Sequence, residues 1–199
     1  MPSALILIAD GTEEMEFTIV YDTLVRAGVK VTSVLISPPS DTSRGDEAET
    51  DAAVRCSRGV RIVPDISQSQ LGASSGKYDA IVIPGGLKGA ETISQSSFIQ
   101  VLVKSFHDSG KLVGMICAAS LVAKTSRLPR QPLTSHPSVK EQLDKDFEYR
   151  EDSVVTRLNR LPLPGTAFPF AFALVEKLCG AQKRSEVIGP MVFPPGTVL

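Results

Sequence analysis

One cysteine occupies a position at which a thiol could act as a nucleophile. Cys117 ends an apolar run and is followed at once by small residues, in the stretch VGMICAAS. This pattern predicts a buried strand that turns sharply into a helix, with the thiol exposed at the turn. The free N–H groups at the start of that helix would favour the thiolate and lower the pKa of the thiol. The alternative is that Cys117 is a small hydrophobic side chain in the core.

A carboxyl group that could act with this thiol lies in the first helical pattern of the chain. The inward stripe of that pattern runs from Phe17 to Gly28, and Glu16 lies about a quarter-turn from its centre. We therefore expect Glu16 to be half-buried near the end of the first strand, with a pKa raised by desolvation. A protonated carboxyl there could donate a hydrogen bond to a thiolate or transfer protons. The alternative is an ordinary exposed glutamate.

Two further segments supply candidate catalytic groups. His136 precedes a proline in LTSHPSVKEQL, so it is expected in an extended conformation just before a helix. It could be a base or a substrate-positioning group, or an ordinary surface side chain. Gly85 and Gly86 follow the apolar segment YDAIVIP. The N–H groups of this glycine turn could face a substrate oxygen, as in an oxyanion hole.

The order of the apolar segments predicts the fold that would gather these residues. Short, nearly continuous apolar runs are typical of strands in a parallel sheet covered on both faces. They alternate with helical patterns, which indicates a doubly wound α/β domain, and ligands bind such sheets at the carboxyl ends of the strands. The expected strands are Ala4–Ala9, Lys30–Ile36, Tyr78–Pro84 and Lys111–Cys117, and the expected helices are Glu13–Ala27, Ser97–Asp108, Ala118–Ser126 and Thr166–Leu178.

The whole chain, residues 1–199, is expected to form one domain. The segment 37–53 is polar and charged, and strand-like sequence resumes at Val54, so we interpret it as a surface insertion rather than a linker. The outer face of the first helix carries Met15 and Ile19. Such an apolar pair could belong to a subunit contact, although single exposed apolar residues are common.

Composition argues against several functional classes. The net charge is −1, aromatic residues make up 6% and tryptophan is absent, so neither a nucleic acid nor an anionic membrane is an expected partner. The apolar runs are too short to span a bilayer and the first residues lack a basic region, so a cytoplasmic, or also nuclear, location is expected. Three cysteines without a CxxC motif and two histidines predict no metal site. No glycine-rich nucleotide motif is present, so no cofactor is expected.

Together and in this order, five segments resemble the DJ-1 branch of the DJ-1/PfpI superfamily. They are LIADGTEEMEF, YDAIVIPGG, GMICAAS, TSHPSVK and PGTAFPFAFALVEKL, and they cover almost the whole chain outside the insertion. The resemblance implies a flavodoxin-like fold, with a mostly parallel sheet between helices. It also implies a homodimer, with Met15 and Arg58 near the subunit interface.

The resemblance also implies roles for the candidate site residues. Cys117 would be the reactive, oxidation-sensitive thiol, Glu16 the protonated acid that hydrogen-bonds it, and His136 the nearby histidine. The backbone N–H groups of Gly86 and Ala118 would bind an oxyanion. The activity implied is that of a glyoxalase III, a cofactor-independent lyase that converts the 2-oxoaldehyde methylglyoxal to lactate without glutathione, with deglycase activity as a further family activity.

Two alternatives to the enzyme stay open. The first is a redox sensor, stress-response or chaperone-like protein whose thiol is oxidised to a sulfinate. The second is a structural α/β module. Two departures from the family pattern bear on turnover: Ala119 stands where glycine is usual after the elbow, and the loop that usually reads Gly-Pro-Gly-Thr begins with Leu163 and Pro164. We expect Ala119 to narrow the elbow and the loop to line the pocket.

Overall fold

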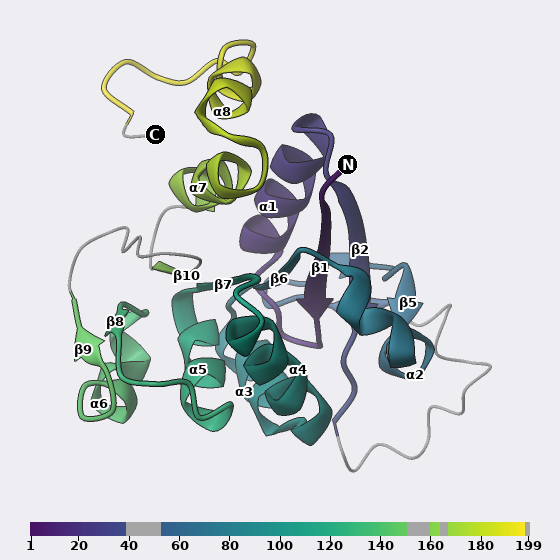
Figure 1. Cartoon of the computed structure of the whole chain (residues 1–199), viewed down its shortest axis with the longest axis vertical. Coiled ribbons are helices and arrows are strands. Elements are labelled where there is room, and N and C mark those ends of the chain that lie inside the picture. Colours follow the sequence, from purple (N-terminus) through teal and green to yellow (C-terminus); the bar gives the residue numbers. More distant parts are fainter. Residues whose placement is uncertain (39–52, 151–159, 164–166, 198–199) are drawn as a thin grey trace.

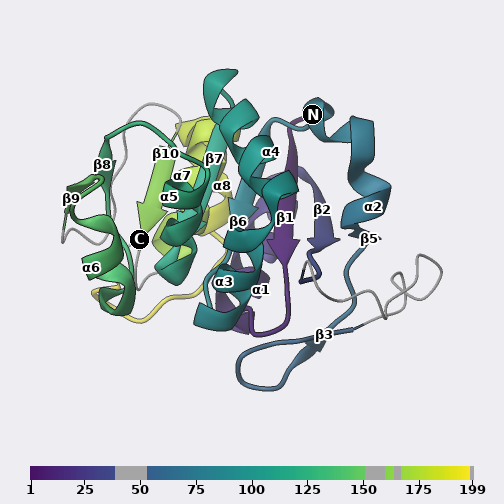
Figure 2. The same cartoon turned by 90° about the horizontal axis from the view of Figure 1, so that it is seen from below.

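A six-stranded parallel sheet forms the centre of the molecule in the computed structural model (Figures 1 and 2), within the residues that the structure describes: 1–38, 53–150, 160–163 and 167–197. The strands lie in the order β10-β7-β6-β1-β2-β5, and all five neighbouring pairs are parallel. The strand bounds are β1 Ser3–Ile8, β2 Lys30–Leu35, β5 Ile66–Ser67, β6 Ala80–Ile83, β7 Leu112–Ile116 and β10 Arg160–Leu163.

Helices cover both faces of this sheet. Figure 1 shows α1, α7 and α8 on one side and α3, α4 and α5 on the other. The helix bounds are α1 Glu14–Arg26, α2 Gln68–Leu71, α3 Leu87–Gln95, α4 Ser97–Asp108, α5 Leu121–Thr125, α6 Lys140–Leu143, α7 Ala167–Cys179 and α8 Ala181–Ile188. Short 3₁₀ segments occupy Gly72–Lys77, Cys117–Ser120 and Pro137–Val139.

Two small strand pairs lie outside the sheet. The strands β3 (Val54–Arg55) and β4 (Arg61–Ile62) form an antiparallel hairpin, and β8 (Pro132–Leu133) pairs in parallel with β9 (Glu148–Tyr149). None of the helices in the described ranges is both long and apolar enough to cross a lipid bilayer.

The alternation of side chains along β1 explains why the apolar runs of the sequence are continuous. Leu5, Leu7 and Ala9 belong to the hydrophobic cluster on one face of the sheet, whereas Ile6 and Ile8 belong to the cluster on the other. Successive side chains of a strand point to opposite faces, so a strand buried on both faces needs apolar residues throughout.

The predicted fold class is confirmed, with differences in its parts. The four expected strands are present as β1, β2, β6 and β7, and the sheet also contains β5 and β10. The helices α2, α3 and α8 were not predicted. The sequence of α8 is AQKRSEVI, in which one residue, Val187, is buried, so it carries little of the apolar periodicity that marks a helix. Within the predicted insertion, residues 39–52 lie outside the described residues.

Candidate active site

The cysteine elbow lies where the sequence predicts it. Cys117 directly follows β7 and begins the 3₁₀ turn that leads into α5. Its backbone φ is +62°, in the left-handed region that side chains other than glycine rarely adopt. A residue in this region costs about 1–2 kcal/mol, and such strain gathers at functional sites. The thiol is half-buried.

Two hydrogen bonds fix the elbow to the segment that carries His136. The His136 N–H donates to the carbonyl oxygen of Cys117 at 3.2 Å. The buried hydroxyl of Ser120 donates to the carbonyl of Thr134 at 2.8 Å. The elbow is therefore held at two points by the segment that precedes the Pro137 turn.

Glu16 reaches this elbow from the first turn of α1. The helix is capped by Glu13, whose carboxylate accepts the Glu16 N–H at 2.8 Å. The Glu16 side chain is half-buried, as expected, and its carboxylate accepts the Gly85 N–H at 2.6 Å and a hydrogen bond from the Cys117 thiol. The acid, the glycine turn and the thiol thus form one hydrogen-bonded group.

The glycine turn leaves no space for a side chain. A Cβ atom on Gly85 would lie 2.5 Å from the Cβ of Cys117 and 2.6 Å from the Glu16 carboxylate. Gly86 has a φ of +86°, and a Cβ there would collide with the backbone of Gly11 and Glu13. Only glycine permits this close approach of three chain segments.

The close contact at Gly85 predicts a specific mutational effect. Gly85→Ala should destabilise the fold by about 1–3 kcal/mol, because the methyl group overlaps both the Cys117 side chain and the Glu16 carboxylate. Gly76→Ala is the matched control, since a Cβ there meets nothing within 4 Å. Thermal unfolding of the two variants checks this, and equal effects of both substitutions would contradict it.

Burial governs the titration of the acid. It raises the pKa of Glu16 from 4.5 to about 7, against the stabilising hydrogen bonds from Gly85 and Cys117, and the neighbouring charge of Glu13 raises it further. Desolvation penalises the charged form of a carboxyl group, which is the cause expected from its border position on the helix.

The pKa of the Cys117 thiol is shifted in the direction opposite to the prediction. The N–H groups of Ala118 and Gly86 do favour the charged form, but burial and the charge of Glu16 outweigh them and raise the pKa of Cys117 to about 11. The expectation of a lowered thiol pKa is therefore wrong when Glu16 is ionised. The helix end alone would lower this pKa, but the packed elbow also removes water from the thiol, and this desolvation is the larger effect.

The two groups must instead be treated as a pair that shares one negative charge. Interacting sites lose protons in steps that belong to the pair and not to either residue. Between about pH 7 and 11 the pair has lost one proton, and the remaining proton lies on the thiol or on the carboxyl group. A thiolate beside a protonated Glu16 has the same net charge as a thiol beside a carboxylate. The hydrogen bond between them provides the path for this exchange.

His136 is close to the elbow through its backbone, but its ring makes a local contact. The side chain is exposed, and its Nδ1 accepts the Ser138 N–H at 3.2 Å and lies 2.8 Å from the Ser138 hydroxyl. Accepting that N–H leaves the proton of the neutral ring on Nε2. A catalytic role for His136 stays a prediction.

The predicted pocket loop begins beside the elbow. In the register of β10 with β7, Leu163 pairs with Ile116, the residue before Cys117. Pro164 lies outside the described residues. Ala119 is fully buried in the hydrophobic cluster on the α3 to α5 side of the sheet, so its methyl group is part of the core.

A buried acid next to the site was missed from sequence. Glu14 is 7% exposed, and its carboxylate accepts hydrogen bonds from the Ser57 hydroxyl at 2.9 Å and the Arg58 N–H at 2.8 Å. Burial opposes its ionisation, but these hydrogen bonds and that of its own backbone outweigh burial and lower its pKa. Glu14 thereby fixes the β3–β4 hairpin against α1. No local signal separates it from the neighbouring first-turn acids.

The other cysteines differ from Cys117 in their surroundings. Burial, together with the charges of Glu14, Glu13 and Asp10, raises the pKa of Cys56 to about 11, and burial raises the pKa of Cys179. Neither has a carboxyl group hydrogen-bonded to its sulfur among the described contacts. Within the described ranges, no group of three or more His, Cys, Asp or Glu side chains is placed to bind a metal ion.

Comparison with known proteins identifies the family of the chain. The sequence model of the DJ-1/PfpI family matches residues 2–177. The chain belongs to this family. It is 41% identical to the protein dj-1beta of Drosophila melanogaster over 189 residues, covering 93% of this chain and 94% of that protein.

A curated relative and a solved structure from Schizosaccharomyces pombe are also similar to the chain. The chain is 33% identical to the glutathione-independent glyoxalase DJ-1 of Schizosaccharomyces pombe, covering 98% of this chain and all of that protein. The solved structure of Schizosaccharomyces pombe DJ-1 superimposes with a TM-score of 0.85 at 33% identity, covering 96% of this chain and 100% of that one.

Proposed function

We propose that this member of the DJ-1/PfpI family is a glutathione-independent glyoxalase. The observation that carries the proposal is that the Glu16 carboxyl group is hydrogen-bonded both to the Gly85 N–H and to the Cys117 thiol. This arrangement places a nucleophile, an acid–base group with a pKa of about 7 and backbone donors around one point. The curated name of the Schizosaccharomyces pombe relative supports the same activity.

The first step adds the thiol to the substrate. The sulfur of Cys117 attacks the aldehyde carbon of methylglyoxal, and the developing oxyanion takes up a proton to give a hemithioacetal. The backbone N–H groups of Gly86 and Ala118, which favour negative charge on the sulfur, would also stabilise negative charge on the oxygen. Glu16, when protonated, is the proton donor nearest to the sulfur.

The second step is an internal oxidation and reduction. Ionised Glu16 removes the proton from the former aldehyde carbon to give an enediol, and the proton is returned to the neighbouring carbon. The first carbon is oxidised to a thioester and the second is reduced to an alcohol, so no external electron carrier is required. Water then hydrolyses the thioester, which releases lactate and restores the thiol. His136 would assist proton transfer at the hydroxyl groups.

Turnover without glutathione tests the proposal. The purified chain should consume methylglyoxal and form one lactate per substrate in the absence of any added thiol or metal. Chiral analysis should give the D-enantiomer, the product implied by a D-lactate dehydratase type of activity. Absence of lactate formation, with a folded and fully reduced protein, would contradict the proposal.

A redox sensor is the second candidate function, favoured by the groups around the sulfur. Two equivalents of peroxide would convert the thiolate to a sulfinate and yield two waters. The N–H groups of Ala118 and Gly86 and a protonated Glu16 would then face the new oxygens. Intact mass after mild peroxide treatment, with peptide mapping, tests this. Added oxygen that maps to Cys56 or Cys179 and not to Cys117 would exclude the sensor.

We also propose a homodimer formed through the face of α1 and the β3–β4 hairpin, in a cytoplasmic protein. Met15 is 65% exposed, and two valines of the hairpin region, Val60 and Val63, are 51% and 60% exposed. Arg58 is exposed on the same hairpin, whereas Ile19 is partly buried against the core. Apolar side chains grouped in this way are typical of an interface between subunits.

The proposed dimer predicts the effect of a charge in its interface. Met15→Glu should shift the protein to the monomer, because burying an unpaired carboxylate in an apolar interface is unfavourable. Val101→Glu, at an equally exposed valine on α4, should leave the dimer intact. Light scattering after gel filtration measures both masses, and a dimeric Met15→Glu protein would place the interface elsewhere.

A further inference from the structure

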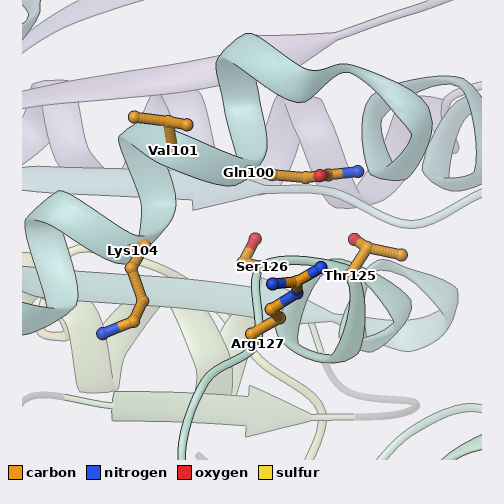
Figure 3. A pocket seen from close by; sticks show the side chains of 6 residues that line it. All are labelled: Gln100, Val101, Lys104, Thr125, Ser126 and Arg127. Carbon is orange, nitrogen blue, oxygen red and sulfur yellow. The ribbon is translucent and has the colours of Figure 1, made fainter.

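A cavity lies between α4 and the turn that ends α5, and shares no residue with the cysteine site. Its volume is about 340 Å³. This is at the lower end of the range for small-molecule pockets. Figure 3 shows the side chains that line it, which are Gln100, Val101, Lys104, Thr125, Ser126 and Arg127.

The wall of this cavity contains a buried hydroxyl group that has no partner. Ser126 is 4% exposed, and its Oγ makes no hydrogen bond within the described part of the chain. Most buried polar atoms in folded proteins are hydrogen-bonded, so an unpaired one calls for an explanation. In Figure 3 the hydroxyl points from the end of α5 towards the α4 side of the cavity. A ligand in the cavity would supply the missing partner.

The next residue, Arg127, occupies a position at the end of α5 where glycine is normally favoured. The N–H groups of Arg127 and Leu128 donate to the carbonyls of Lys124 and Ala123, which closes the C-terminus of α5, and Arg127 has a φ of +52°. Glycine is the usual residue at this position of such a helix end. Figure 3 shows the Arg127 guanidinium beside the side chains of Ser126 and Thr125.

The lining is cationic and lacks acidic groups. Lys104 is held by Asp108, at 2.6 Å, and its ammonium group points away from the hydroxyl groups in Figure 3. Gln100 donates one amide hydrogen to the Ser94 carbonyl, and its second is available to the cavity. The donors that face the cavity are therefore the Arg127 guanidinium, the Ser126 hydroxyl and the Gln100 amide. Such a set fits an oxyanion.

We propose that this cavity binds a small organic anion, with a carboxylate or phosphate group on a short apolar stem. The planar guanidinium of Arg127 binds two oxygens of the anion, and Ser126 donates a third hydrogen bond. The stem lies along Val101, which is 71% exposed at the edge of the cavity. Butyl phosphate and butyrate are the two probes, because they share the stem and differ in the charged group.

Titration of the full-length, isotope-labelled protein with each probe tests the site by amide chemical shifts. At least one probe should give saturable shifts confined to residues 100–104 and 123–128, and the tighter of the two identifies the anionic group. Inorganic phosphate should bind less tightly than butyl phosphate, because it lacks the stem. Absence of saturable shifts at these residues with both probes would overturn the proposal.

Two variants separate binding from folding. Arg127→Gly should weaken binding at least tenfold, yet it should melt no lower than the wild type because glycine relieves the left-handed backbone. Ser126→Ala should weaken binding several-fold without loss of stability, since it removes a hydroxyl that has no partner among the described residues of the unliganded fold. Wild-type affinity in Arg127→Gly would overturn the assignment.

Two controls locate the site. Arg130→Gln alters a cation outside the cavity, whose guanidinium donates to the Lys145 carbonyl at 3.0 Å, and should change affinity less than twofold. Cys117→Ser should leave the affinity unchanged, because the cavity does not include the elbow. An equal loss in Arg130→Gln would indicate attraction to general positive charge, and a loss in Cys117→Ser would place the probe at the catalytic site. Either result overturns the proposal.

Discussion

Cys117→Ser should lower kcat/KM for methylglyoxal by about a thousandfold or more. The proposed reaction passes through a covalent bond to the sulfur, and a serine hydroxyl is a much weaker nucleophile than a thiol when no strong base activates it. Glu16, with a pKa of about 7, is too weak a base to ionise a hydroxyl group to a useful extent. The substitution changes one atom, so the strained elbow and its hydrogen bonds should be preserved.

The measurement is lactate formation in the absence of glutathione, for the wild type and two cysteine variants. Cys179→Ser is the matched control, because Cys179 is also a half-buried free thiol but lies at the end of α7. It should retain wild-type turnover. If Cys117→Ser retained most of the activity, the covalent mechanism would be refuted, and the reaction would have to proceed by acid–base chemistry at Glu16 alone.

Glu16→Gln should affect activity and stability in opposite directions. Activity should fall by about a hundredfold or more, because glutamine cannot accept or donate the protons of the enediol steps. Stability at pH 8 should rise. The folded protein raises the pKa of Glu16 from 4.5 to about 7, so this side chain favours the folded state fully below pH 4.5 and ceases to do so as the pH rises through 7.

The size of the stability effect follows from the same shift in the pKa of Glu16. At pH 8 the half-buried carboxylate costs about 3 kcal/mol relative to the neutral acid, and glutamine avoids this cost while it can still accept the Gly85 N–H. Near pH 4.5 the two proteins should have almost equal stability. Denaturant unfolding at both pH values checks this, with Glu91→Gln as a control at an exposed acid. If Glu16→Gln were no more stable than the wild type at pH 8, the ionised Glu16 side chain would not destabilise the fold, and the prediction would be wrong.

The same variant also reports on the shared proton. Alkylation of Cys117 in the wild type should begin to rise near pH 7, where the pair loses its first proton, and rise again towards pH 11. Glu16→Gln should abolish the step near pH 7 and give one step below 11, because burial still raises the pKa but the repulsion from Glu16 is gone. A persistent step near pH 7 in the variant would show that Glu16 is not the group coupled to the thiol.

The sequence predicted those parts of the site that depend on local pattern. The apolar run before Cys117 located the end of β7, and the helical stripe of α1 placed Glu16 at a border position. The roles of the glycine turn were less evident, because the contact between Gly85 and the other two residues is made by segments that are 32 and 69 positions away in the chain.

Properties that depend on tertiary packing were beyond a single sequence. The desolvation that raises the pKa of Cys117 arises only when α1 and the elbow pack together. Glu14 is one of three glutamates at the start of α1, with Glu13 and Glu16. Only its contact with the β3–β4 hairpin, which is remote in the sequence, makes it a buried hydrogen-bond acceptor. The cavity beside Arg127 likewise depends on α4, which no local motif connects with the end of α5.

The close packing at Gly85 has a consequence for how long the site stays active. The thiol directly follows β7, the glycine turn follows β6, and the acid lies in the first turn of α1, so all three are attached to the central strands of the sheet or to a helix that packs on it. Such central strands generally open only when the whole domain opens. The catalytic group is thus part of the same cooperative unit as the core, and its working lifetime is set by the unfolding rate of the molecule.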